Sequence, residues 1–357
     1  MMEKMTSKER ILRTFRRQEV DHIPMVDYPW ATTAARWVKE GMPANVDWRD
    51  YFGFDKIAQV KADNSPRYPR IVYEENDEYV IQTTSFGRKE KVFRNLTTTP
   101  EPLEFYYNTS KRWEEAKAKI LEFHEDRIPW KTLEKNYPIW KKEGRFLELG
   151  LWFGFDVTHS GLVGTEDLLI AMYEEPEWVT DMFDTYLTVS LDLAQRILDA
   201  GYAFDSIFWW DDMGYKGSPF FSPAAYRELL KPFHKRAVDW AHERGMLAEL
   251  HSCGFIEPMI PDLVDIGVDM LNPIEVKAGM DPKRLKENWG DKLAFHGGIN
   301  AQIWDQPELV RAEMEKIIPI MKEGGGYMFA SDHSIPDSVS LENMRIISDL
   351  AHKLGKY

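Results

Sequence analysis

The sequence predicts an α/β fold, a (β/α)8 barrel of the TIM type. From Gly144 onward, short apolar runs alternate with longer amphipathic ones, which is the pattern of strands and helices around a parallel sheet. The chain has 357 residues, a length that such a barrel reaches as one domain. No Gly-x-Gly-x-x-Gly motif follows a predicted strand, so the nucleotide signature of the alternative architecture, an open doubly wound sheet, is absent.

The first 143 residues depart from this alternation. Residues 23–26 form a short apolar run that ends at Asp27 and predicts a buried strand. Residues 30–40 and 110–142 have helical patterns, the second interrupted near a proline. Between them, residues 68–95 are rich in β-branched and aromatic side chains separated by Asp, Gly and Asn turn signals. We expect antiparallel hairpins there, as an excursion from the barrel.

The alternating part supplies most of the predicted barrel. Its strands are predicted at 146–151, 206–210, 246–250, 268–271, 293–295 and 327–330. Its helices are predicted at 166–200, 222–243, 257–266, 281–288, 307–322 and 340–354. With residues 23–26 these make seven strands, and an eighth, at 56–60 or within 70–95, would close the barrel. We therefore expect one domain over 1–357, with N-terminal helices and a hairpin insertion in 1–143 and regular repeats in 144–357.

Composition and charge exclude several classes of protein. The chain has 45 basic and 59 acidic residues and a net charge of −14, which argues against nucleic acid or an anionic membrane as the main partner. One cysteine excludes an internal disulfide, so nothing indicates an oxidising compartment. The N-terminus is charged throughout and has no apolar signal-peptide core, and no apolar run approaches the length of a membrane span. We expect a soluble, cytoplasmic protein.

Polar side chains follow six of the predicted strands. Because the carboxyl ends of parallel barrel strands meet at one mouth, we expect these side chains to line a single site. They include three of the nine histidines, which makes a chance arrangement hard to accept. The strand-end residues are Asp27, Asp211 with Asp212, His251 with Cys253, Asn272, His296, and Asp332 with His333.

His251 and Cys253 form the sharpest feature of this set. Residues two apart on a strand point to the same face, so the imidazole and the only thiol of the chain are expected to project together. Nitrogen and sulfur ligands of this kind suit zinc. His333 ends another strand and is the natural third ligand, and three protein ligands with one open position are typical of catalytic zinc. Taken alone, His251 is more often a buried, hydrogen-bonded histidine than a ligand.

The other strand-end groups are candidates to orient substrate or to act as acid or base: Asp27, Asp211, Asp212, Asn272 and His296. Each also has a structural interpretation. One of the two adjacent aspartates is expected to cap the following turn, and Asn272 before Pro273 fits a turn equally well. His296 beside two glycines fits a histidine that bonds a backbone carbonyl.

Other polar and aromatic residues are expected to be less informative. Glu249 is expected to point away from the barrel interior. The aromatic residues near strand ends either wall an apolar pocket or belong to the core. The remaining histidines lie mostly on predicted loops or helix faces, where solvent exposure is the default expectation: His22, His124, His159, His234, His242 and His352.

The order of segments resembles the uroporphyrinogen decarboxylase superfamily, nearly from end to end. The resemblance rests on RILRTFRRQEVDHIPMVD, WWDDMGYKGSPFFSPAAYRELLKPFHKR, HSCGFIEPMIPDLVDIGVDMLNPIE, MDPKRLKENWGDKLAFHGGIN and FASDHSIPDSVSLENMRIISDL. It implies a (β/α)8 barrel and one of two chemistries. One branch decarboxylates porphyrinogen acetate side chains without a cofactor. The other consists of cobalamin-dependent methyltransferases, similar to the enzymes that methylate coenzyme M, which bind zinc through His-x-Cys and a later Cys.

Two departures from the family patterns separate these branches. The decarboxylases carry an arginine-containing stretch after the first strand that holds substrate carboxylates, whereas here Pro24 is followed by MVDYPWATTA. A substrate with several carboxylates needs such cationic forks, so this departure disfavours a porphyrinogen. The methyltransferase His-x-Cys is matched by His251 and Cys253, and the later Cys falls at or next to His333. A Cys-to-His exchange keeps a zinc ligand and makes the metal more Lewis acidic.

We therefore expect a zinc-dependent methyltransferase that moves a methyl group between a small substrate or thiol and a corrinoid held on a separate partner protein. Two alternatives stay open at this point. One is a cofactor-independent decarboxylase that acts on a different, smaller acid, and the other is a barrel that binds a corrinoid or tetrapyrrole without turnover. Neither nucleic acid nor a membrane is expected as a partner. Whether the chain forms a homodimer stays open at this point.

Overall fold

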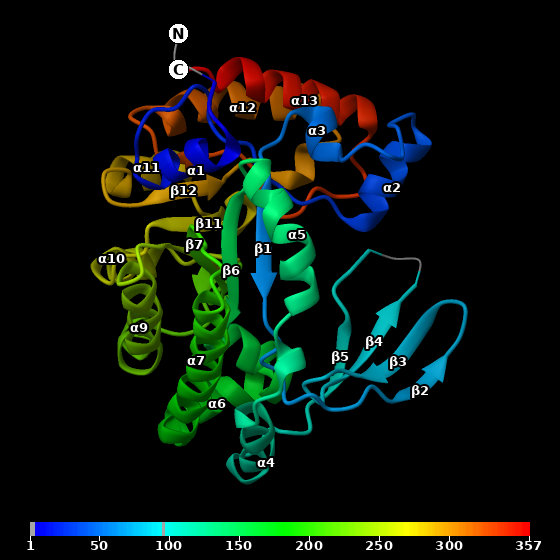
Figure 1. The fold of residues 1–357 in the computed structure, drawn as a ribbon, viewed down its shortest axis with the longest axis vertical. Helices are drawn as coiled ribbons and strands as arrows, with labels where there is room; N and C mark the ends of the chain where they lie inside the picture. The colour runs from blue at the N-terminus through cyan, green and yellow to red at the C-terminus, as the bar shows by residue number, and fades with distance from the viewer. Residues whose placement is uncertain (1–3, 95–96) are drawn as a thin grey trace.

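The centre of the computed structural model, which describes residues 4–94 and 97–357, is a curled sheet of seven parallel strands (Figure 1). In sheet order the strands are β1 (Ile57–Lys61), β6 (Phe146–Trp152), β7 (Ser206–Trp210), β10 (Leu247–His251), β11 (Met270–Ile274), β12 (Ala294–Gly297) and β13 (Tyr327–Met328). Each predicted strand from residue 146 onward is present, with its ends shifted by at most three residues. The sequence offered two places for the eighth strand, and the first of them, residues 56–60, corresponds to β1. The fold is of the TIM-like α/β kind.

Residues 23–26, predicted as a strand, lie between the two edges of this sheet. On one side Met25 makes a parallel bridge to Phe329, which follows β13. On the other side the Asp55 backbone N–H donates to the Met25 carbonyl at 2.8 Å, two residues before β1. The segment is held by isolated bridges and not by a continuous ladder of hydrogen bonds, so residues 23–26 do not form the regular strand that was predicted.

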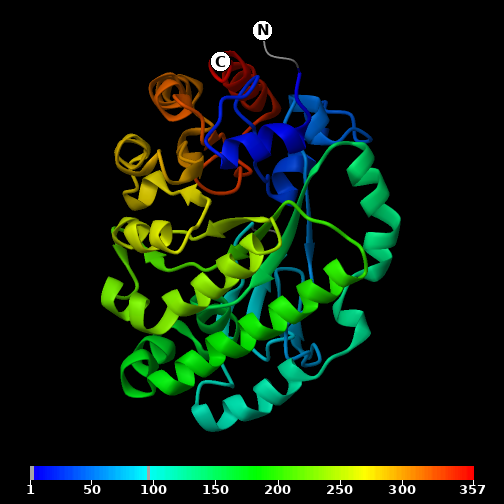
Figure 2. The ribbon, with the colours of Figure 1, turned by 60° about the vertical axis from the view of Figure 1, so that its left-hand side comes forward.

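Helices of the repeats cover the outside of the sheet (Figure 2). Their bounds are α6 (Thr165–Glu174), α7 (Pro176–Asp199), α9 (Lys231–His242), α10 (Ile260–Asp265), α11 (Pro282–Trp289), α12 (Pro307–Lys322) and α13 (Leu341–Leu354). The predicted helix 166–200 divides where Pro176 opens α7, because proline has no backbone N–H for a preceding turn and suits a first helical position. The predicted helix 222–243 divides likewise, into α8 (Pro223–Ala225), a π-turn at Tyr226–Leu230, and α9.

Helix α1 (Ser7–Phe15) closes the amino end of the sheet. Its first turn carries a full capping box, in which the Thr6 hydroxyl accepts from the Glu9 backbone N–H and the Glu9 carboxylate accepts from the Thr6 backbone N–H. Ile11 and Phe15 pack with Phe146 and with residues of β11, β12 and β13 in a separate apolar cluster, and fully burying each such side chain contributes about 1.5–3 kcal/mol. The amino end of the sheet is therefore filled.

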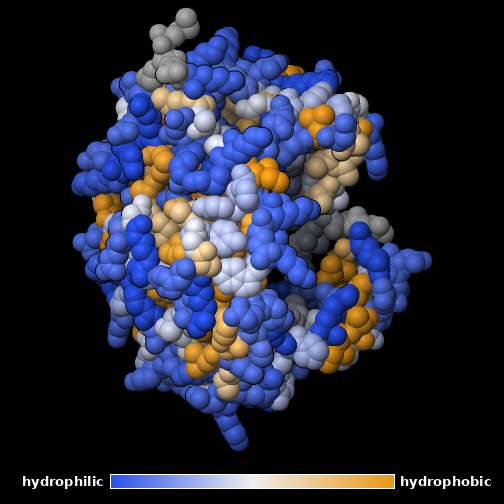
Figure 3. Space-filling model, in the orientation of Figure 1, coloured by the Kyte–Doolittle hydropathy of each residue, from blue (hydrophilic) through white to orange (hydrophobic). Residues whose placement is uncertain are grey.

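The remaining N-terminal elements flank the sheet. They are α2 (Ala31–Lys39), α3 (Trp48–Phe52), α4 (Ser110–Leu121) and α5 (Trp130–Lys142), the last two confirming the predicted interruption of 110–142. The hairpins predicted at 68–95 are confirmed as an antiparallel sheet of β2 (Val72–Glu75), β3 (Tyr79–Thr83), β4 (Lys89–Phe93) and β5 (Glu101–Glu104). Asn95, the last residue of that prediction, lies outside the described residues. This sheet projects from the side of the molecule, and Figure 3 shows a hollow between it and the region of α2.

Among the described residues, no helix combines the length and the apolar character that crossing a bilayer requires.

Candidate functional site

The carboxyl ends of the strands surround a cavity of about 650 Å³. Its volume falls in the range of small-molecule sites, which is roughly 300–1,000 Å³. The side chains that line it include most of the polar strand-end residues, as parallel strand ends predict. Those on the wall are Asp27, Asp212, His251, Cys253, Asn272, His296 and His333.

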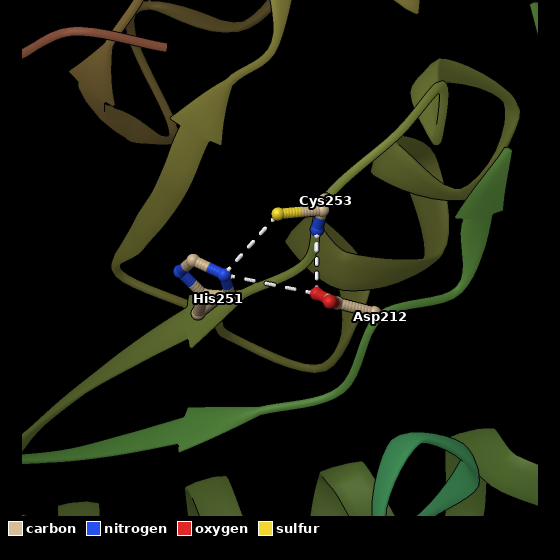
Figure 4. Close-up of side chains that lie close together, drawn as sticks. All are labelled: Asp212, His251 and Cys253. Atoms are coloured by element: carbon tan, nitrogen blue, oxygen red, sulfur yellow. Dashed lines mark hydrogen bonds and ion pairs between the residues drawn. The ribbon is translucent and has the colours of Figure 1, made fainter. Parts of the chain in front are cut away.

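Asp212, His251 and Cys253 lie together at the ends of the neighbouring strands β7 and β10 (Figure 4). Their ligand atoms all lie within 4.8 Å of one another. His251 Nε2 is 3.4 Å from the Cys253 sulfur and 3.7 Å from Asp212 Oδ1. The Cys253 backbone N–H also donates to Asp212 Oδ1 at 2.7 Å, which fixes the carboxylate beside the thiol. The predicted pairing of His251 with Cys253 is present, and Asp212 completes the group.

Asn272 orients the imidazole of His251. The Nδ1–H of His251 donates to Asn272 Oδ1 at 2.5 Å across the β10–β11 pair. With its proton on Nδ1, the ring presents the lone pair of Nε2 to Cys253 and Asp212. A hydrogen bond of this kind to the far nitrogen is the usual arrangement around metal-binding histidines, because it fixes the tautomer and raises ligand basicity.

The donor set fits a zinc ion. Bond lengths of about 2.3 Å to sulfur and about 2.05 Å to nitrogen, at tetrahedral angles, place these two atoms about 3.6 Å apart. The same reasoning gives about 3.4 Å for nitrogen and a carboxylate oxygen. The observed separations of 3.4 Å and 3.7 Å each lie within a few tenths of an ångström of these values. His333 lines the same cavity but does not join this close group, and its ring instead packs at 6.3 Å from that of Trp30.

Charge and burial around Cys253 bear on how a metal would bind. Burial, with the negative charges of Asp212 and Glu275, raises the pKa of the Cys253 thiol well above its usual value. The thiol of the metal-free protein is therefore neutral near pH 7. A bound cation would displace this proton, since metal ligation requires the thiolate.

Asp27, after the N-terminal segment 23–26, and His296, on β12, form another part of the cavity wall. Asp27 accepts hydrogen bonds from the Ser331 backbone N–H at 2.7 Å and from the Tyr28 backbone N–H at 2.7 Å. Burial nevertheless raises the pKa of the Asp27 carboxyl to about 6. A carboxyl with this pKa can hold or release a proton near neutrality, as acid–base work requires.

His296 is anchored at both ring nitrogens. Nδ1 donates to the Glu249 carboxylate at 2.9 Å and Nε2 donates to the Val26 carbonyl at 3.0 Å. Burial lowers the pKa of His296, but the hydrogen bond and charge of Glu249 outweigh it and hold that pKa above its usual value. Because both partners are acceptors, the ring is a buried imidazolium. The expected bond to a backbone carbonyl is present, and it coexists with a place on the cavity wall.

The expectation that Glu249 points away from the interior is wrong. Glu249 lies two residues before His251 on β10, so the two side chains share a face, and Glu249 lines the cavity. Sequence reasoning also missed Glu148 and Gln59, which line the cavity floor on β6 and β1. The signal for Glu148 was available, because it is a single acid within the apolar run Phe146–Trp152.

Asp211 and His234 lie behind the strand ends rather than in the cavity. The two fully buried side chains bond each other, His234 Nε2 to Asp211 Oδ2 at 2.7 Å, and Asp211 also accepts from the Asp156 backbone N–H at 2.6 Å. Asp211 therefore joins α9 to the end of β7, the structural role expected for one of the two aspartates. The expectation that His234 is exposed is wrong, because it faces the sheet from α9 to meet this carboxylate.

Comparison with known proteins agrees with this architecture. A sequence model of the family described as "Uroporphyrinogen decarboxylase (URO-D)" matches residues 157–354, more than half of the chain. The chain belongs to the URO-D family. The matched range contains Asp212, His251 and Cys253, and four of the five segments on which the resemblance rests, whereas Asp27 precedes it.

The URO-D relatives in curated collections match only parts of the chain. A uroporphyrinogen decarboxylase of Ruthia magnifica is 19% identical over 186 residues, 52% of this chain and 52% of that protein. One of Vesicomyosocius okutanii is 30% identical over 74 residues, 20% of this chain and 21% of that protein. The chain thus aligns with about half or less of the length of these relatives.

A solved structure covers the chain more fully. A methyltransferase from Methanosarcina mazei superposes with a TM-score of 0.64 and 16% sequence identity, over 98% of this chain and 99% of that one. At this identity the likeness establishes a shared fold. It places this URO-D-family chain on the same scaffold as a methyltransferase.

Proposed function

We propose that the protein is a zinc-dependent methyltransferase that exchanges a methyl group between a small substrate or thiol and a corrinoid held on a separate protein. The observation that carries the proposal is the donor set of Asp212, His251 and Cys253, in which the distances from His251 Nε2 to the sulfur and to the carboxylate suit one tetrahedral ion. His333, on the same cavity wall, stays a prediction as a further ligand. Support also comes from the fold that the chain shares with a methyltransferase.

The residues of the chain have distinct tasks in this proposal. His251, oriented by Asn272, and Cys253 would hold zinc, with Asp212 as the oxygen ligand. Zinc would supply Lewis acidity, which lowers the pKa of a bound thiol or polarises a donor oxygen. Asp27, with its pKa raised to about 6, would take up or return the proton that the acceptor exchanges. The filled amino end of the sheet leaves the carboxyl-end mouth as the face to which a corrinoid protein would bring its cobalt.

The proposal is tested by metal content together with methyl transfer. Protein reconstituted with zinc and dialysed is expected to hold about one equivalent, and His251→Ala and Cys253→Ser are expected to lose it. Asp211→Asn, a strand-end carboxylate outside the cavity, is the matched control and should keep its zinc. Less than about one-tenth equivalent in the wild type, with no further loss in the two variants, would contradict the proposal.

A decarboxylase acting on a different acid is the second candidate. The specific observation in its favour is Asp27, a buried carboxyl with a pKa of about 6 on the wall of a cavity in a URO-D-family chain. Such a group can protonate a carbanion without a metal. Carbon dioxide release from a panel of small acids by zinc-free protein, abolished in Asp27→Asn, would favour this function over methyl transfer.

A further inference from the structure

The floor of the cavity holds a carboxyl group for which the proposed function gives no task. Glu148 lies on β6, is 1% exposed and belongs to the cavity lining. Its Oε2 accepts one hydrogen bond from Gln59 Nε2 at 3.2 Å. Within the described part of the chain its other oxygen, Oε1, has no hydrogen-bond partner. Buried polar atoms nearly always have partners, so an unpartnered oxygen on a cavity wall indicates a ligand group that completes it.

Sheet register places this group well below the proposed zinc site. Glu148 pairs with Ser206 of β7, and Ser206 pairs with Leu247 of β10, four residues before His251. At about 3.3 Å per residue, the backbone of Glu148 lies roughly 13 Å along the strands from that of His251. A substrate that reaches from the zinc site to the floor is therefore a small, elongated molecule with a polar group at its far end.

The charges on the floor select the kind of polar group. Glu249 is already paired with the His296 imidazolium, whereas Glu148 has no cationic partner among the described residues. Burial and the charge of Glu249 raise the pKa of Glu148 well above its usual value, and a bound cation would favour its ionised form. Arg49 also lines the cavity, but its guanidinium is paired with Asp47 at 3.1 Å. A substrate carboxylate or phosphate would thus find no unpaired cation on the floor among the described residues, whereas a substrate cation would balance the charge of an ionised Glu148.

The walls above the floor support the same choice. Phe208 lines the cavity on β7, two residues beyond the register partner of Glu148. Trp210 lies level with His251, and the Lys61 ammonium already lies 4.7 Å from its ring centroid. The faces of aromatic rings attract cations, and this attraction grows where water is excluded. A protonated amine can thus meet the Glu148 carboxyl at one side and the ring of Phe208 at the other.

We propose that Glu148 anchors an ammonium-binding subsite, in which the N–H of a small protonated amine substrate donates to Oε1 while Phe208 walls the amine. The assignment of this subsite to a substrate rests on the proposed function, and it narrows the small substrate of that function to an amine. Binding at the subsite itself needs no metal.

The experiment is a calorimetric titration of the full-length protein, with and without zinc, by three probes of one shape: benzylammonium, benzyl alcohol and benzoate. Benzylammonium is expected to bind at least about tenfold more tightly than benzyl alcohol, because a hydrogen bond to a charged group is stronger than a neutral one. Benzoate is expected not to bind the floor. Equal affinity for the amine and the alcohol, or tighter binding of benzoate, would overturn the proposal.

Glu148→Gln tests the residue. This variant keeps the shape and loses the charge, so its affinity for benzylammonium should fall about tenfold or more while that for benzyl alcohol stays. Glu313→Gln is the control. Glu313 is a partly buried acid whose pKa is raised like that of Glu148, but it lies outside the cavity lining. An unchanged affinity for benzylammonium in Glu148→Gln would refute the assignment.

A measurement on the wild type keeps the proposal testable if Glu148→Gln does not fold. A bound cation favours the ionised carboxyl, so the affinity for benzylammonium should rise with pH through the titration of Glu148, whereas the affinity for benzyl alcohol should not. The same pH dependence for both probes would count against the subsite. Amine binding that persists in zinc-free protein, with no zinc uptake on reconstitution, would keep the subsite and reject the proposed zinc chemistry.

Discussion

Asn272→Ala removes the hydrogen bond that orients the imidazole of His251, while the three proposed ligand side chains stay in place. The bond is 2.5 Å long and joins His251 Nδ1 to Asn272 Oδ1. Loss of such a bond behind a metal ligand costs about 10–100-fold in metal affinity, or about 1.4–2.7 kcal/mol. Without it, the ring can carry its proton on Nε2, the nitrogen that faces Cys253 and Asp212, and zinc must then displace that proton.

The assay is competition for zinc between the protein and a chromophoric chelator at fixed pH. Asn343→Ala is the matched control, because the Asn343 side-chain amide also makes a hydrogen bond, here donating to the Trp304 carbonyl at 3.4 Å, but lies outside the cavity. We expect the zinc affinity of Asn272→Ala to fall 10–100-fold and that of Asn343→Ala to stay within about twofold. An Asn272→Ala protein that binds zinc as tightly as the wild type would refute the role given to His251.

Two further predictions concern buried charges. The pKa of Asp27 is raised to about 6, so the wild type should lose stability, relative to Asp27→Asn, as the pH rises from the unfolded value of about 3.9 through 6. The change is about 3 kcal/mol in the free energy of unfolding by urea, and a pH-independent difference would contradict the assignment. His234→Ala leaves Asp211 buried without its partner and should cost about 3 kcal/mol or more with zinc content unchanged, whereas the exposed His242→Ala should cost under about 1 kcal/mol. Equal losses of unfolding free energy in the two variants would show that the buried pair stabilises the protein no more than the exposed one.

The sequence predicted the regular part of the fold because local patterns dominate there. Apolar runs bounded by turns and capping residues marked β6, β7 and β10 to within one residue at each end. The segment 23–26 was harder, because its bridge to Phe329 and its hydrogen bond from Asp55 depend on contacts far along the chain. Helix divisions at Pro176 and before α9 were marked by proline, a local signal that periodicity alone does not weigh.

The site could be predicted where the alternation of side chains along one strand decides which face a residue occupies. It could not be predicted where the bonding partner comes from another element of the fold. His251 and Cys253 could be paired from their spacing alone. The same rule, applied to Glu249, would have put it in the cavity beside them. Asp212 could not be told from Asp211 in advance, because only the fold shows that His234 of α9 bonds Asp211 and leaves Asp212 beside the thiol. The unpartnered oxygen of Glu148 depends on which residues of β1 and β7 face it.

The most direct test of the central claim is the X-ray absorption spectrum of the zinc-reconstituted protein at the zinc edge. The account predicts a four-coordinate ion with one sulfur at about 2.3 Å and the remaining ligands nitrogen or oxygen at about 2.0–2.1 Å. The sulfur contribution should vanish in Cys253→Ser, while Asp211→Asn should leave the spectrum unchanged. A spectrum of zinc bound by nitrogen and oxygen alone in the wild type would contradict the account.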